Sequence, residues 1–300
     1  DALAKISPPI PAFPGTAIHG FGGGAYHHMS QSTFQPTSIA GFSTKNDNTS
    51  IGTSNSGVVY KPDINVGLGL KGTIIVGLTA KQIFNADVTL EANFEKDGGL
   101  NQISLNGNGR FLSNNEMTEG VATASINVIY SVPNKVFDLK ANLELKKDPF
   151  LVTGDFGIYT QMQGEETKWN VIFGRPKQFG SPLTAEIAGF EALKAYFQAG
   201  NFKVDPMPPI PDWISKALNG FESNRQGYNS NNKTNPSIIF GASTGFSYGG
   251  KFLIFKGSLK AEAGFDFMLK KYDKDCNNKP LGPSTTFGLN GWYANGQVWA

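Results

Sequence analysis

Cysteine is nearly missing from this chain of 300 residues, because Cys276 is the only one. A disulfide within the chain is therefore impossible, and a metal site built on several cysteine ligands is excluded. Histidine is also scarce, since only His19, His27 and His28 occur, crowded near one end. No nucleophile–base arrangement, HExxH motif or phosphate-binding loop accompanies them. We therefore expect a protein that is not an enzyme.

Charge of one sign and long apolar runs are lacking as well. The 26 basic and 24 acidic residues give a net charge of +2 and form no block of either sign. Such a balance gives no support for nucleic acid or a charged membrane surface as a partner. Because no run of 18 apolar residues occurs, the sequence predicts no transmembrane helix.

Glycine, aromatic residues and a two-residue periodicity are abundant. The chain contains 36 Gly and 23 Phe, which suits β-sheets with tight turns and close backbone approach. The clearest stretch is 252–269, in which apolar or small residues alternate with a set that includes Lys256 and Glu262. This alternation is typical of a strand with one dry face and one wet face.

The same alternation recurs along most of the chain. In residues 85–95 we expect the apolar residues to face the protein interior and the polar residues between them to face water. A turn at 96–99, with its Asp-Gly pair, leads to a return strand over 103–111. The predicted fold is all-β, a large antiparallel meander in the form of an open sheet, a sandwich or a barrel, with one or two short helices. We expect helices over 183–202 and 213–219.

Changes in composition divide the chain into four predicted parts. Residues 1–57 form an extended, loop-rich lead-in, and residues 58–204 form a first β unit. Residues 205–236 are a Pro- and Asn-rich linker with a short helix, and residues 237–300 form a second β unit. Because the last strand pattern runs to the final residue, we expect this unit to continue beyond the chain end.

One turn contains the beginning of a calcium-binding loop. Asp273, Asp275 and Asn277 have the D-x-D-x-N spacing of such a loop. The sixth position, which requires glycine, is Asn278, and Ser284 stands where a glutamate ligand is needed. The turn is therefore either a loose calcium site or a plain polar turn, and calcium is the one cofactor that the sequence suggests.

Aromatic residues concentrate in the last ten positions of the chain. Large aromatic side chains are costly to leave in water, and strand edges are natural templates for pairing with a neighbour. We therefore expect Trp292, Tyr293 and Trp299 to contact other protein subunits or further domains of the same polypeptide.

Two glycine- and aromatic-rich stretches carry a resemblance. Residues 20–29 read GFGGGAYHHM, and residues 288–300 read GLNGWYANGQVWA. They resemble segments of very large β-rich surface and secreted proteins of the Bacteroidota, which implies export to the bacterial envelope and a role in a cell-surface assembly. The predicted function is a non-enzymatic structural or adhesive scaffold, secreted or on the cell surface, and a piece of a longer polypeptide.

Two other functions remain open. Strands of about ten residues with alternating polarity also describe an outer-membrane β-barrel that acts as a channel or transporter. The charges at Lys140, Glu144 and Lys146 argue against a lipid-facing surface, although they could line a lumen. A membrane is a partner only in this alternative. A carbohydrate-active enzyme or binding module is the third reading, but no pair of carboxylates stands out.

Overall fold

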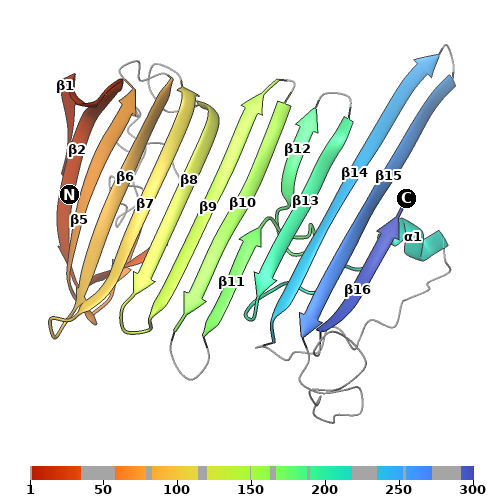
Figure 1. Ribbon diagram of the computed structural model, residues 1–300. Coiled ribbons are helices and arrows are strands. Elements are labelled where there is room, and N and C mark those ends of the chain that lie inside the picture. Colours follow the sequence, from red (N-terminus) through yellow and green to blue (C-terminus); the bar gives the residue numbers. More distant parts are fainter. Residues whose placement is uncertain are drawn as a thin grey trace, which may run out of the picture. The chain divides into compact units, whose positions relative to one another are not determined.

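The computed structural model describes residues 2–34, 58–78, 83–113, 120–148, 150–162, 167–187, 190–217, 235–252, 255–271 and 292–300. The predicted fold class is confirmed, because fourteen strands form one antiparallel sheet, two further strands form a separate pair, and helix is almost absent (Figure 1). The elements are β1 (Ala2–Phe13), β2 (Thr16–His27), β3 (Met29–Phe34), β4 (Val58–Pro62), β5 (Val66–Leu78), β6 (Phe84–Glu95), β7 (Leu100–Ser113), β8 (Gly120–Ser131), β9 (Val136–Lys147), β10 (Phe150–Gln161), β11 (Lys168–Phe173), β12 (Leu183–Ile187), β13 (Phe190–Gly200), α1 (Asp212–Ala217), β14 (Ser237–Phe252), β15 (Phe255–Lys271) and β16 (Trp292–Trp299).

The first of two compact units comprises residues 1–147 and 161–166. Its strands follow the order β1-β2-β5-β6-β7-β8-β9, and β3 pairs with β4 in a separate hairpin. The predicted turn at 96–99 is present, with Gly98 at a φ of 98° and the Glu95 amide donating to the Gly99 carbonyl at 2.7 Å. Residues 2–34, which belong to the expected lead-in, supply β1, β2 and β3. The prolines of β1 suit its place at the end of this order, since proline is confined to edge strands.

The two faces of this unit are reversed relative to the expectation. Leu90 is 54% exposed, whereas Glu91 beside it is 1% exposed. The expectation that residues 85–95 turn their apolar side inward was therefore wrong, although the alternation itself is correct. A two-residue period separates two faces but does not say which one is covered. Here Tyr60 of β4 donates a hydrogen bond to Glu91, so the β3–β4 hairpin lies on the polar face. The buried polar residues of β6 and β7 are Asn85, Asp87, Thr89, Glu91, Asn93, Ser104, Asn106, Asn108 and Arg110.

On the opposite face, the described residues of strands β5 to β9 include no charged side chain between Leu68 and Leu145. The register of the four strand pairs places only aliphatic residues, phenylalanine, glycine and one tyrosine there. We call this set the apolar face of the first unit. It consists of Leu68, Leu70, Gly72, Ile74, Val76, Leu78, Phe84, Ala86, Val88, Leu90, Ala92, Phe94, Leu100, Ile103, Leu105, Gly107, Gly109, Phe111, Ala122, Ala124, Ile126, Val128, Tyr130, Phe137, Leu139, Ala141, Leu143 and Leu145.

The second unit comprises residues 148–160 and 167–300. In it, β12 pairs with β10 and β13, and β13 continues through β14 and β15 to β16. The helix predicted over 183–202 is wrong, because this stretch forms β12 and β13. Its helix-forming residues are overridden by pairing, since β13 has strand partners on both of its edges. The short helix expected over 213–219 is present as α1 at Asp212–Ala217.

The second unit also leaves an apolar face exposed, but its covered face is mixed. Gln198 and Asp266 are buried there beside the apolar side chains of Ile239 and Met268. On the other face, Phe197, Phe265 and Val298 are 39%, 41% and 86% exposed. The buried face is covered by the chain between β13 and α1. Among the described residues, no helix has the length and apolar character needed to cross a membrane.

Candidate functional site

The polar face of the first unit is organised around the buried carboxylate of Glu91. Tyr26 on β2 and Tyr60 on β4 each donate a hydrogen bond to one of its two oxygens. The two phenol rings lie 4.6 Å apart between centroids, and the Lys71 ammonium lies 5.1 Å from the Tyr60 ring centroid. Burial and the negative charge of Glu91 raise the pKa of the Tyr60 hydroxyl, which keeps it a donor. One carboxylate thus fastens the β3–β4 hairpin to the sheet.

A second polar group lies next to it on β6 and β7. Arg110 Nη1 lies 3.4 Å from Asp87 Oδ1, and Asn108 Nδ2 donates to Asp87 Oδ2 at 3.2 Å. Asn127 of β8 donates to Asn106 of β7. These contacts form because paired strands place side chains of equal parity on one face. The result is a surface rich in amides, hydroxyls and paired charges, which Ile129 of β8 interrupts.

Some hydrogen-bonding capacity on this polar face is unused. Asn93 Oδ1, Ser104 Oγ and Asn106 Nδ2 are buried and have no hydrogen-bond partner among the described residues. Buried polar atoms are almost always paired with protein or with ordered water. The face therefore has both donors and acceptors available for water or for a hydrophilic solute.

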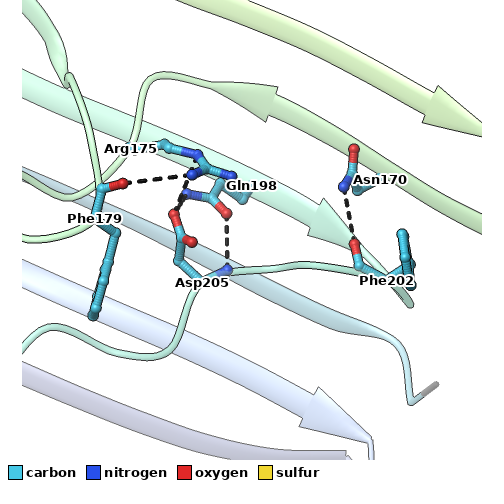
Figure 2. Close-up of polar contacts among 6 residues, drawn as sticks. All are labelled: Asn170, Arg175, Phe179, Gln198, Phe202 and Asp205. Atoms are coloured by element: carbon cyan, nitrogen blue, oxygen red, sulfur yellow. Dashed lines mark hydrogen bonds and ion pairs between the residues drawn. The ribbon is translucent and has the colours of Figure 1, made fainter. Parts of the chain in front are cut away.

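In the second unit, residues 201–211 lie over the polar face of β13. Figure 2 shows the amide of Gln198 facing Asp205, where Gln198 Nε2 donates to Asp205 Oδ2 at 2.7 Å and Asp205 N donates to Gln198 Oε1 at 3.0 Å. Arg175 Nε lies 3.5 Å from the same carboxylate oxygen. Asn170 Nδ2 donates to the Phe202 carbonyl at 2.9 Å, which fixes the start of the segment.

The rest of this covering segment is held by apolar packing and by Asp266. Met207 packs in a buried cluster with Tyr196, Ile239 and Met268. Tyr196 donates to Asp266 Oδ1 at 2.5 Å. Gln297 of β16 donates to Asp266 Oδ2 and to the Pro208 carbonyl, the latter at 3.3 Å. The segment is therefore anchored across four strands, β13 to β16, by several separate contacts.

A cavity of about 170 Å³ remains between this segment and the strands. Its walls include Pro208, Tyr196, Asp266 and Trp299, together with lysine and glutamate side chains. Trp299 lies flat over Gly264, since a Cβ atom at Gly264 would come within 2.4 Å of the indole ring. Its Nε1 is buried without a hydrogen-bond partner among the described residues.

The structure describes the aromatic residues that the sequence suggested as an interface, but not the residues that it suggested as a calcium site. Asp273, Asp275 and Asn277 lie outside the described residues, so the calcium reading stays a prediction. Within the described ranges, no three metal-ligating side chains gather at one place. Trp292, Tyr293 and Trp299 are all on β16 and half-buried, but Trp292 and Trp299 are at its two ends, and Trp299 is a wall of the cavity. Their proposed contact with another subunit also stays a prediction.

The polar cluster around Glu91 and the cavity beside Trp299 were not predicted from the sequence. One signal was available for the first, because residues 85–95 and 102–110 place Asn, Asp, Thr, Ser, Glu and Arg at every second position. A dry apolar interior does not require so many hydrogen-bonding side chains on one face. No comparable signal links Trp299 with Gly264, which lie 35 positions apart and meet only through the pairing of β15 with β16.

Comparisons with known proteins give no relative for this chain, since no protein-family model, curated protein or solved structure matches it.

Proposed function

We propose that this chain is a membrane-embedded β-sheet protein of the bacterial outer membrane. Its apolar faces contact lipid acyl chains, and its polar faces line an aqueous interior through which hydrophilic solutes pass. The observation that carries the proposal is the apolar face of the first unit, which has no charged position across five strands. Outer-membrane proteins built from strands alternate apolar residues toward lipid with polar residues toward the interior.

Exposure supports lipid as the partner of this face. Leu90, Phe111, Tyr130 and Leu143 are each more than 40% exposed and lie on four adjacent strands. Soluble monomeric proteins rarely leave a continuous apolar patch larger than a few hundred Å² in water. A face that spans five strands is far wider than a single ligand or peptide groove, whereas a bilayer covers it without further shape requirements.

The dimensions of the apolar face also fit a bilayer. From Phe84 to Phe94 the strand β6 rises about 33 Å, which corresponds to about 25 Å of depth at the usual strand tilt. Phe84 pairs with Phe111 at one end, with ring centroids 4.8 Å apart, and Tyr130 pairs with Phe137 at the other. Aliphatic residues and glycine fill the positions between. Two aromatic rows around an aliphatic band are typical of the two membrane interfaces.

The polar faces support an aqueous interior. Each unit uses its own chain to cover part of this face: the first uses the β3–β4 hairpin, and the second uses residues 201–211. The unused donors and acceptors at Asn93, Ser104 and Asn106 require water or a polar solute. Such inward-folded segments on a polar lining narrow an aqueous passage.

The structural or adhesive scaffold expected from the sequence stays a prediction. In that reading another protein subunit covers the apolar faces in place of lipid. The described contacts favour lipid, because Tyr130 is the one hydrogen-bonding side chain among the described residues of the apolar face, whereas protein interfaces combine their apolar core with a polar rim.

The test is reconstitution of the purified full chain into phosphatidylcholine vesicles, followed by flotation after an alkaline carbonate wash. The proposal predicts that the chain stays with the vesicles and that loaded vesicles admit sucrose. A chain that is monodisperse without detergent and remains in the wash contradicts the membrane placement and favours the scaffold. Firm insertion without sucrose entry contradicts the proposed passage alone.

A further inference from the structure

The cavity of the second unit has features of a ligand site that the membrane proposal does not use. It lies between the proline-rich covering segment and the polar face of β13 to β16, and its volume is about 170 Å³. All of its walls belong to one unit. The site therefore stands whether or not the sheet lies in a membrane.

The indole of Trp299 is placed in this cavity by a specific arrangement of the strands. Trp299 on β16 pairs with Gly264 on β15, and Gly264 pairs with Ser243 on β14. A side chain at Gly264 would collide with the indole, so glycine is what allows the ring to lie across β15. This position buries the indole nitrogen.

The buried N–H of Trp299 requires an acceptor. Indole nitrogen is a donor only, and burying it without a partner costs the full desolvation of the group. No described residue accepts from it. A hydroxyl or carbonyl oxygen of a ligand in the cavity would supply the missing partner.

The remaining walls define the chemistry of that ligand. Two lysines, Lys177 and Lys194, and two carboxylates, Glu262 and Asp266, line the cavity, so its charges balance. A neutral ligand is favoured over an anion or a cation, because either ion would meet like charges. The rings of Trp299 and several prolines offer flat apolar surfaces to a ring that carries C–H groups.

We propose that this cavity binds a neutral hydroxylated ring, the chemistry of a monosaccharide unit. Its hydroxyl groups accept from Trp299 Nε1 and from the lysines, and they donate to Glu262. Its C–H face packs against the indole and the proline rings. Asp266 is a positioning residue, since its two oxygens accept from Tyr196 and Gln297 and hold the floor of the cavity.

The experiment is calorimetric titration of the full chain in detergent with glucose, galactose and N-acetylglucosamine, and separately with acetate. The proposal predicts binding of at least one sugar and no binding of acetate. Trp299→Phe, which keeps a ring but removes the N–H, should weaken sugar binding about tenfold, because a buried hydrogen bond is lost. Trp169→Phe is the matched control, since Trp169 does not line the cavity, and it should leave the affinity unchanged.

A second variant keeps the test decisive if Trp299→Phe does not fold. Glu262→Gln should weaken sugar binding severalfold, because a charged acceptor forms the stronger hydrogen bond. The same change would strengthen the binding of an anion by removing a like charge. Absence of binding for all three sugars, equal affinity in Trp299→Phe, or preferential binding of acetate overturns the proposal. None of these results depends on flotation with vesicles, so failure here is separate from failure of the membrane placement.

Discussion

The two units cover the same kind of polar face in different ways. In the first unit, Glu91 accepts hydrogen bonds from Tyr60 of the β3–β4 hairpin and from Tyr26 of the sheet. In the second, residues 201–211 combine the Gln198–Asp205 pair with the apolar packing of Met207. The hydrogen bonds described for the first cover thus converge on one charged residue, beside ring contacts of Tyr60 with Tyr26 and Lys71, whereas the contacts of the second cover are distributed. The difference implies that one substitution can release the first cover but not the second.

Glu91→Ala should have the largest effect. The change leaves the buried phenol of Tyr60 and the half-buried phenol of Tyr26 without an acceptor. Removing one partner from a buried charged group of this kind costs about 4 kcal/mol of unfolding free energy. Urea unfolding of the full chain in detergent measures this loss, and hydrogen exchange should show faster exchange in β4. Glu95→Ala, an exposed change on the same strand, is the control and should stay within about 0.5 kcal/mol of the parent. Equal stability of the two variants would remove Glu91 as the anchor.

Met207→Ala should have the next largest effect. The side chain packs with Tyr196, Ile239 and Met268, and its removal leaves a cavity that costs about 3 kcal/mol. Since the Gln198–Asp205 hydrogen bonds remain, the segment should stay on the sheet, and exchange at residues 201–211 should rise only moderately. Met162→Ala, at an exposed position, serves as the comparison in the same urea measurement. Complete release of the segment would show that its contacts are not distributed.

Arg175→Ala should have a small effect. The Arg175 side chain is 37% exposed and its Nε lies 3.5 Å from Asp205 Oδ2, so solvent screens much of the ion pair and the loss is about 0.5 kcal/mol. The contrast is sharper when thermal unfolding of this variant is compared with that of Gln198→Leu, which removes both hydrogen bonds between Gln198 and Asp205. A loss from Arg175→Ala as large as that from Gln198→Leu would contradict the ranking.

The β3–β4 hairpin of the first unit should lose stability gradually, and only above pH 10. Because the folded pKa of Tyr60 is raised above its ordinary value of 10.0, the stability from its hydrogen bond is fully present below pH 10 and is lost as pH rises toward the folded pKa. Absorbance of tyrosinate should therefore show at least one tyrosine that resists ionisation above pH 10. In Tyr60→Phe, the rise in tyrosinate absorbance that occurs well above pH 10 should be smaller. An unchanged titration curve would contradict the assignment of this rise to Tyr60.

The sequence was sufficient for the fold class but not for the direction of the faces. The alternation in 85–95 predicted β6 and its turn correctly, because a two-residue period and an Asp-Gly turn are local properties. It did not say that Glu91 is buried and Leu90 exposed, since that depends on the hairpin that covers one face. Residues 190–200 show the same limit, because strand neighbours on both edges determine a conformation that helix propensity does not predict.

The candidate cavity could not be predicted from the sequence, because it too depends on which distant strands pair. Trp299 was singled out as a costly aromatic, but its position depends on Gly264 and on a proline-rich segment that local rules describe only as stiff and extended. Register between distant strands brings these residues together. Sequence patterns indicate that such strands exist, whereas the pairing decides which side chains meet.

The central claim is that the apolar face contacts lipid and the polar face contacts water. The most direct measurement is the collision of a nitroxide label with oxygen and with a water-soluble nickel chelate, at Leu90→Cys and at Ser125→Cys, in a Cys276→Ser chain reconstituted into vesicles. These positions lie on opposite faces of the first unit. The account predicts that the label at 90 collides mainly with oxygen and the label at 125 mainly with the nickel chelate. Preference for the chelate at 90, or protection of position 90 from both reagents, would contradict it.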